Sequence, residues 1–118
     1  MGRKDELGRR GEDVAARWFE GDGYVVVERN WRTRTGEIDL IVRRGATTVF
    51  AEVKTRTSVA YGHPFEAITA EKAARLRRLA AEWCREHGPL PGGVRIDAVA
   101  VIDAWSAEPQ IEHLAGVA

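Results

Sequence analysis

Three charged side chains lie at the centres of two segments that are rich in apolar and β-branched residues. Asp39 lies within the run Gly36–Val42. Glu52 and Lys54 lie within the run Thr47–Arg56. Charged residues are depleted from β-strands, and burying a charge is costly unless it is paired or bound to a metal. Their presence in segments suited to a protein core therefore indicates a chemical role.

A short glycine-containing turn, residues 43–46, separates the two segments and predicts a β-hairpin. Side chains alternate between the faces of a strand, so Glu52 and Lys54 share one face. Same-face side chains lie roughly 7 Å apart along a strand, and paired strands lie about 4.8 Å apart. Asp39 on the neighbouring strand is therefore expected close to Glu52.

Two carboxylates at this separation repel each other, and a divalent cation removes the repulsion. Hard cations prefer oxygen ligands, so Asp39 and Glu52 are candidate ligands for such a cation. Lys54 would then lie beside any water that the cation holds. The alternative is a structural ion pair between Glu52 and Lys54, although the neighbouring residues are too apolar for a fully solvated strand.

An acid, a spacer and Glu-x-Lys on an apolar hairpin resemble the core of the PD-(D/E)XK nucleases, which have the restriction endonuclease-like fold. Longer motifs, spread over nearly the whole chain, resemble the YraN-type family of small uncharacterised bacterial proteins, a family similar to archaeal Holliday-junction resolvases. The motifs are Gly8–Glu12 at the start of a helix, Gly36–Ile41, Phe50–Arg56 and Tyr61–Pro64. Ile38 stands where the superfamily name places a proline, which is often absent there.

The resemblance implies a metal-dependent DNA endonuclease, with branched or junction DNA as one candidate substrate. Asp39, Glu52 and the Val53 carbonyl would hold Mg²⁺ or Mn²⁺, which polarises the phosphate and lowers the pKa of a bound water. Lys54 would orient that water or stabilise developing negative charge. Glu12 would complete the catalytic set, because resolvase-like nucleases carry an acid on this helix. The alternative for Glu12 is an exposed residue of the first helical turn.

A second reading comes from another functional class: a nucleic-acid-binding or scaffold protein without turnover on the same nuclease-like fold. An enzyme should gain stability from Mg²⁺ or Mn²⁺ bound to its folded state, and a scaffold should not. Because resolvases act as symmetric dimers, the resemblance is also compatible with a homodimer.

Basic residues near the hairpin are candidates for contacts with DNA phosphates, which position a nucleic acid without reading its sequence. The candidates are Arg32, Arg34, Arg56 and Lys72. Plain solvated charge is the alternative for each arginine. On the helix that carries Lys72, the pairs Glu71–Arg75 and Arg78–Glu82 are spaced four apart, so we expect a solvent face of internal ion pairs.

Hydrophobic periodicity predicts a single domain, residues 1–118, of the α/β class. Helices are expected at residues 5–20, 65–68 and 70–87, and strands at 24–31, 36–42, 47–56, 94–102 and 110–114. With the resemblance, this order predicts a restriction endonuclease-like three-layer sandwich in which helices flank a central mixed sheet. On the first helix, Trp18 and Phe19 are both expected to be buried.

Composition limits the remaining functional classes. The 118 residues suffice for one core, and 18 basic against 18 acidic residues argue against a protein that coats DNA through net charge. No apolar run approaches the roughly 20 residues that cross a bilayer, and the charged segment Met1–Glu6 leads into no signal sequence. Cys84 is the only cysteine, so no internal disulfide forms. These features predict a cytoplasmic protein without a membrane partner.

Overall fold

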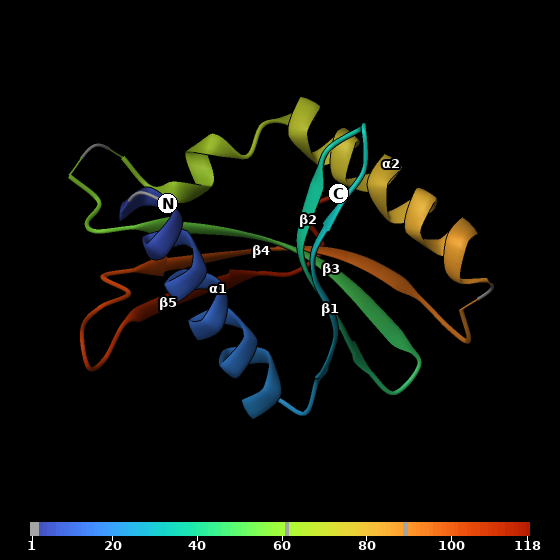
Figure 1. The fold of residues 1–118 in the computed structure, drawn as a ribbon, viewed down its shortest axis with the longest axis horizontal. Helices are drawn as coiled ribbons and strands as arrows, with labels where there is room; N and C mark the ends of the chain where they lie inside the picture. Colours follow the sequence, from blue (N-terminus) through green and yellow to red (C-terminus); the bar gives the residue numbers. More distant parts are fainter. Residues whose placement is uncertain (1–2, 61, 89) are drawn as a thin grey trace.

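The computed structural model describes residues 3–60, 62–88 and 90–118 (Figure 1). Tyr61, which begins one of the motifs above, lies outside the described residues. The elements are α1 (Arg3–Gly21), β1 (Val25–Arg32), β2 (Glu37–Arg44), β3 (Thr47–Arg56), the 3-10 helix η1 (Pro64–Ala67), α2 (Ala70–His87), β4 (Val94–Ile102) and β5 (Gln110–Leu114). Their order and types are those expected from the sequence, and their ends agree within two residues.

The five strands form one mixed sheet in the order β1-β2-β3-β4-β5. β1, β2 and β3 pair antiparallel, β3 and β4 pair parallel, and β4 and β5 pair antiparallel. A parallel pair needs a crossover connection, which η1 and α2 provide. α1 packs on one face of the sheet and α2 on the other (Figure 1). The predicted α/β class and the arrangement of a mixed sheet between helices are therefore confirmed.

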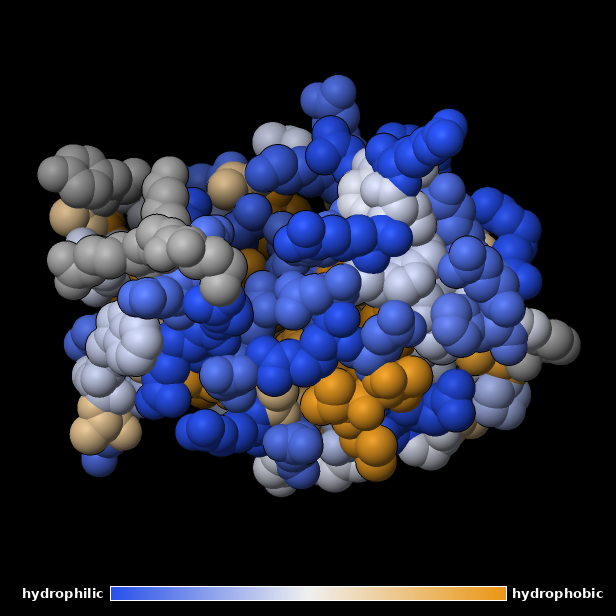
Figure 2. Space-filling model, in the orientation of Figure 1, coloured by the Kyte–Doolittle hydropathy of each residue, from blue (hydrophilic) through white to orange (hydrophobic). Residues whose placement is uncertain are grey.

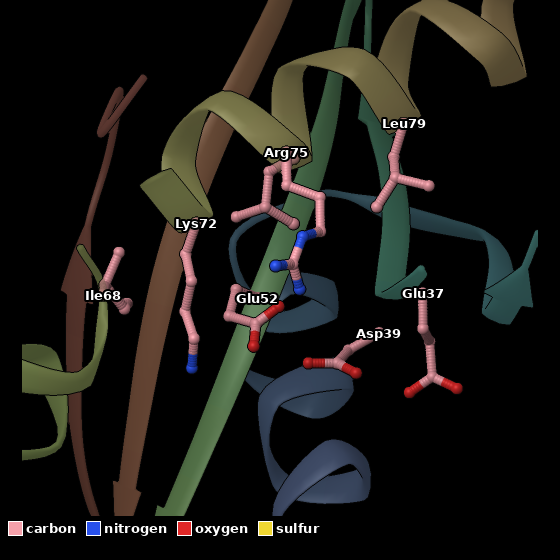
Figure 3. Close-up of a pocket in the computed structure, with 8 residues that line it drawn as sticks. Glu37, Asp39, Glu52, Ile68, Lys72, Arg75 and Leu79 are labelled. Atoms are coloured by element: carbon pink, nitrogen blue, oxygen red, sulfur yellow. The ribbon is translucent and has the colours of Figure 1, made fainter. Parts of the chain in front are cut away.

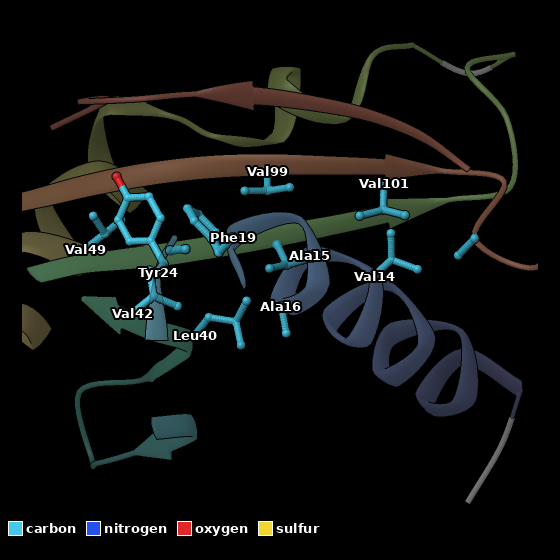
Figure 4. Close-up of a cluster of buried hydrophobic side chains, with 13 residues drawn as sticks. Val14, Ala15, Ala16, Phe19, Tyr24, Leu40, Val42, Val49, Val99 and Val101 are labelled. Atoms are coloured by element: carbon cyan, nitrogen blue, oxygen red, sulfur yellow. The ribbon is translucent and has the colours of Figure 1, made fainter. Parts of the chain in front are cut away.

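The sheet has one hydrophobic core under α1 and another under α2. α1 contributes small side chains and one aromatic ring to the core on its own side (Figure 4). Ala15 and Phe19 are fully buried, as expected. Trp18 is 43% exposed, so its predicted burial is wrong. It lies at the border of the helix, where its indole Nε1 donates a hydrogen bond to His113 Nδ1 at 3.3 Å. The indole N–H thus has a hydrogen-bond acceptor, which the apolar core under α1 does not offer.

α1 approaches β3 closely at Gly11. A Cβ atom at this position would lie 1.9 Å from Thr55 Oγ1 and 2.8 Å from Thr55 Cβ. Both distances are shorter than atoms tolerate, so glycine is what lets the helix lie this near the strand. The close approach fixes the next residue, Glu12, beside the C-terminal half of β3.

α2 has a defined start and an apolar inner face. Thr69 caps it, because its side chain accepts a hydrogen bond from the Lys72 N–H at 3.1 Å. Leu76, Leu79, Ala80 and Trp83 are buried against the sheet. Trp83 meets Phe50 of β3 edge to face, with ring centroids 5.6 Å apart. This packing holds α2 in place over β2 and β3.

A buried polar network connects β4, β5 and the C-terminal segment on the α1 face. Asp97, which is 0% exposed, accepts two hydrogen bonds from Arg95 at 2.8 Å and one from the Gly116 N–H at 3.1 Å. Because Trp18 donates to Nδ1 of His113, the ring proton lies on Nε2, which donates to Asp97 at 2.6 Å. Burial opposes ionisation of Asp97, but these hydrogen bonds outweigh it and lower its pKa. This charge in the sheet therefore has a structural explanation.

The surface in the view of Figure 2 is mostly hydrophilic and carries one small apolar patch below the centre. In the described part of the chain, no helix combines the length and the apolar character needed to cross a membrane. The chain has 18 basic and 18 acidic residues, and two of the acids, Asp39 and Asp97, are buried.

Candidate functional site

β2 leaves its ladder with β3 at Asp39. The paired residues end at Leu40 and Ala51. Ile38 packs in the core under α2, and Leu40 packs in the core under α1. On a regular strand, residues two apart share a face. The strand is therefore twisted at Asp39. Here the Asp39 side chain replaces a backbone carbonyl of β2 as acceptor, and its Oδ2 accepts a hydrogen bond from the Val53 N–H at 2.8 Å.

The same irregularity orients the Val53 carbonyl. The N–H and C=O of one residue point to the same side of a strand, so the carbonyl faces the gap between β2 and β3 into which the amide donates. β2 no longer pairs with β3 at this level. The carbonyl oxygen of Val53 is therefore directed toward the neighbourhood of Asp39.

Asp39 and Glu52 line one pocket between the sheet and α2, with a volume of about 210 Å³. Figure 3 shows their carboxylates turned toward each other, with Glu37 beside Asp39. α2 closes the opposite side. The remaining lining residues are Ile68, Lys72, Arg75, Leu76 and Leu79. The pocket thus has acids on the sheet side, and bases and apolar side chains on the helix side.

The acids of this pocket repel one another. The pKa of Asp39 is raised to about 8, first by burial and then by the negative charge of Glu52. The hydrogen bond from Val53 opposes the rise, while Glu12 and Glu37 add to it. Asp39 is 9% exposed, so water screens this repulsion poorly. The raised pKa means that a proton and a cation would compete for the carboxyl group of Asp39.

Lys54 contacts Glu52 directly. Its Nζ lies 3.0 Å from Glu52 Oε1, and both side chains are 19% exposed. The ion pair that the sequence left as an alternative is thus present. A carboxylate has two oxygens and about four lone-pair sites, so the pair leaves Glu52 able to bind a second cationic partner.

Glu12 lies beside the pocket of Asp39 and Glu52 and does not line it. It lines a second hollow, between α1 and the C-terminal half of β3, together with Val53 and Lys54. Burial raises the pKa of Glu12, while a hydrogen bond with Asn30 opposes the rise. Its buried Oε1 has no hydrogen-bond partner among the described residues. Glu12 is therefore more enclosed than an exposed residue of a first helical turn.

Of the four predicted phosphate contacts, Lys72 lines the pocket. Arg32 instead forms an ion pair with Glu37. Arg34 is exposed at the turn between β1 and β2. Arg56 is exposed, and its Nη1 donates to the carbonyl of Thr55 at 3.0 Å. The structure therefore brings Lys72 into the pocket of the acids and Arg32 against Glu37 at its edge. Arg56 lines the second hollow with Glu12 and Lys54, and Arg34 lies apart from both.

The model of a family described as "Uncharacterised protein family UPF0102" matches residues 11–101 of this chain. The chain belongs to the UPF0102 family. This is the YraN-type family, so the resemblance seen in the sequence is confirmed. A UPF0102 protein of Leifsonia xyli subsp. xyli is 67% identical over 117 residues, and one of Beutenbergia cavernae is 56% identical over 117 residues. In both comparisons 99% of each chain is covered.

Arg75 of this UPF0102 protein was missed as a site residue by sequence reasoning, which expected it to pair with Glu71. It lines the pocket instead. Glu82, expected to pair with Arg78, accepts hydrogen bonds from two threonine hydroxyls of the β1–β2 turn. The spacing Lys72, Arg75, Leu76, Leu79 was the available signal, because it places both bases beside the buried stripe of α2.

Proposed function

We propose that this UPF0102 protein is a metal-dependent DNA endonuclease that hydrolyses phosphodiester bonds. The observation that carries the proposal is the mutual approach of Asp39 and Glu52 in one pocket, which helps to raise the pKa of Asp39 to about 8. A fold gains no stability from two carboxylates that repel each other. Such a pair is useful where a divalent cation binds between them.

The oxygen donors of the site fit Mg²⁺ or Mn²⁺. Asp39, Glu52 and the Val53 carbonyl would hold the cation, and the unpaired Oε1 of Glu12 could accept a hydrogen bond from one of its waters. Within residues 3–60, 62–88 and 90–118, no three His, Cys, Asp or Glu side chains are grouped so as to hold a metal by themselves. Mg²⁺ commonly binds through one or two carboxylates, waters and substrate phosphates, so this donor set suffices.

When bound, the cation would supply Lewis-acid polarisation of the phosphate and a lowered pKa of a bound water. Lys54, held by Glu52, would donate a hydrogen bond to the attacking water or to a phosphate oxygen, where its charge stabilises negative charge as it develops. Lys72 would contact a phosphate from the α2 side of the pocket. Arg32, Arg34 and Arg56 would contact other phosphates of the same nucleic acid.

Cleavage of linear, flapped and four-way DNA in the presence of Mn²⁺ tests this function. We expect the parent protein to cut at least one substrate, and we expect chelation by EDTA to stop the reaction. Asp39→Asn and Glu52→Gln should each abolish cleavage, because each removes a ligand charge and keeps the side-chain shape. Lys54→Ala should slow turnover and retain Mn²⁺ binding. A parent that cuts none of these substrates and gains no stability from Mn²⁺ would show that the proposal is wrong.

A second candidate function is nucleic-acid binding without turnover, and the Glu52–Lys54 ion pair favours it. In this pair, Lys54 balances the charge of Glu52 without a metal ion. If this is its sole role, Glu52→Gln leaves the Lys54 charge unpaired and should destabilise the metal-free protein by about 3–5 kcal/mol. Thermal melts of Glu52→Gln in EDTA, run beside the cleavage assay, therefore distinguish the two functions.

The resolvase resemblance also leads us to propose that two copies act together on DNA. Sedimentation velocity with and without four-way DNA tests this. A monomer at every protein concentration, including in the DNA complex, would favour action at a single strand or at an end.

A further inference from the structure

Two bases of α2 face the acids across the pocket. Figure 3 shows the side chains of Lys72 and Arg75 reaching from the helix toward Glu52 and Asp39. They are three residues apart, so they project from the same side of α2. The pocket is therefore lined by cations and carboxylates on opposing walls.

The opposing charges do not neutralise each other. Within the described parts of the chain, the side chains of Lys72 and Arg75 form no ion pair or hydrogen bond. An arginine carries five N–H donors and no acceptor, so the donors of Arg75 are open toward a ligand.

The stem of Arg75 is supported over the start of β2. A Cβ atom on Gly36, whose φ is +151°, would lie 3.4 Å from Arg75 Cδ and 3.4 Å from Leu79 Cδ1. The aliphatic part of the side chain thus passes close over the glycine backbone, as long charged side chains do when their stems pack and their heads stay free. This contact restricts the stem and leaves the guanidinium group directed at the pocket.

We propose that Arg75 and Lys72 form a phosphate-binding pair that holds one backbone phosphate of a nucleic-acid strand opposite Asp39 and Glu52. Arg75 donates two parallel hydrogen bonds to the phosphate oxygens, and Lys72 supplies a point charge. The placement of this phosphate for cleavage rests on the proposed nuclease function. The binding of the phosphate by α2 does not, because it needs only the two bases.

The affinity of a short fluorescein-labelled DNA strand, measured by anisotropy in Mn²⁺ over a series of salt concentrations, tests the pair. Gel electrophoresis checks that the strand stays intact. We expect Arg75→Ala to weaken binding by about tenfold or more and to reduce the slope of log K against log salt by roughly 0.7, the value for one contact on a single strand. Arg75→Lys should restore the slope and recover the affinity only in part, since it keeps the charge and loses the two-pronged geometry.

Arg77→Ala is the matched control. Arg77 is an exposed arginine of the same helix and is not among the residues that line the pocket. The Arg77→Ala substitution should leave both the affinity for the DNA strand and the slope of log K against log salt unchanged. Equal affinities and equal slopes for Arg75→Ala and Arg77→Ala would overturn the proposal, as would a parent protein that does not bind the strand.

Calorimetric titration with Mn²⁺ alone separates this proposal from the nuclease function. Arg75→Ala should bind Mn²⁺ as well as the parent or more tightly, because a nearby positive charge is removed. Absence of Mn²⁺ binding by the parent, with weakened DNA binding by Arg75→Ala, would refute the nuclease function and support the phosphate-binding pair. Loss of Mn²⁺ binding together with a lower melting temperature in Arg75→Ala would show that Arg75 only supports the fold.

Discussion

Asp39 combines deep burial with the approach of another carboxylate, and its substitution should stabilise the metal-free protein. Asparagine retains an oxygen that accepts the hydrogen bond from Val53, and it removes the charge that Glu52 repels. We expect Asp39→Asn to raise the free energy of unfolding in EDTA by on the order of 1–2 kcal/mol at pH 8. Urea unfolding measures this. Asp13→Asn is the control, because its ion pair with Arg29 is exposed and should contribute at most about 1 kcal/mol.

The same residue predicts how the stability of the metal-free protein changes with pH. Its pKa is raised from 3.8 to about 8 in the folded state. Between these values the folded state binds more protons than the unfolded state, so the contribution of Asp39 to stability falls as the pH rises from about 4 to about 8. Urea unfolding across this range should show a flatter profile for Asp39→Asn than for the parent. Identical profiles would contradict a raised pKa at Asp39.

Asp97 should behave in the opposite way. Its buried carboxylate accepts hydrogen bonds from Arg95, His113 and the Gly116 amide, and its pKa is lowered. Its contribution is present above the ordinary pKa of an aspartate and is lost as the pH falls through the lower folded value. Asp97→Asn leaves Arg95 without its charged partner, so we expect a loss of about 3–5 kcal/mol in unfolding free energy at pH 7. A loss below about 1 kcal/mol would mean that the network contributes little to stability.

The contact between α1 and β3 can be tested with two glycines of one helix. Gly11→Ala would place a Cβ atom 2.8 Å from Thr55 Cβ, which a side-chain rotation cannot relieve, so α1 must move away from the strand. We expect a loss of roughly 2–3 kcal/mol in unfolding free energy. Gly8→Ala, with nothing within 4 Å of the new Cβ, should instead stabilise the protein by about 0.5–1 kcal/mol. Urea unfolding of both variants decides whether Gly11 serves close packing, and equal effects would show that it does not.

The elements themselves were predictable because their signals are local. Thr69 marks the start of α2, and Gly88, with a φ of 81°, follows its end. The apolar segment 94–102 predicted a strand buried on at least one face, and 110–114 predicted an edge strand. β4 and β5 have these ends in the structure. The burial of Trp18 was predicted wrongly, because helical periodicity shows which face of α1 is apolar and does not show how far the sheet extends beneath that face.

The details of the site depend on departures from regularity, which periodicity does not reveal. Strand alternation indicated that Asp39 and Glu52 lie near each other, but the hydrogen bond from Val53 to Asp39 follows from the point at which β2 leaves the ladder. The direction of Arg75 likewise depends on the backbone of Gly36, which is distant in the sequence. Spacing four apart suggested a partner for Arg75 on its own helix, whereas tertiary packing directs it to the pocket.

The balance of charge over the whole chain places further demands on the pocket. With 18 basic and 18 acidic residues, the net charge supplies no general attraction for DNA. Several arginines outside the pocket are also paired, among them Arg29 with Asp13 and Arg44 with Asp22. Binding of a nucleic acid must therefore depend on a few local contacts, and its salt dependence should be modest.

Binding of a cation should stabilise the entire fold, because the acids converge only when β2, β3 and α1 are assembled. A ligand that binds the folded state alone adds about 2.7 kcal/mol to the unfolding free energy at a concentration of 100 times its Kd. We therefore expect Mn²⁺ to raise the melting temperature of the parent and to leave that of Asp39→Asn unchanged. The rise should be larger at pH 8 than at pH 6, since Mn²⁺ must displace the proton of Asp39 and proton release favours binding at higher pH. Asp13→Asn, which lies outside the pocket, should respond as the parent does. An equal rise in the parent and in Asp39→Asn would place the cation elsewhere on the protein.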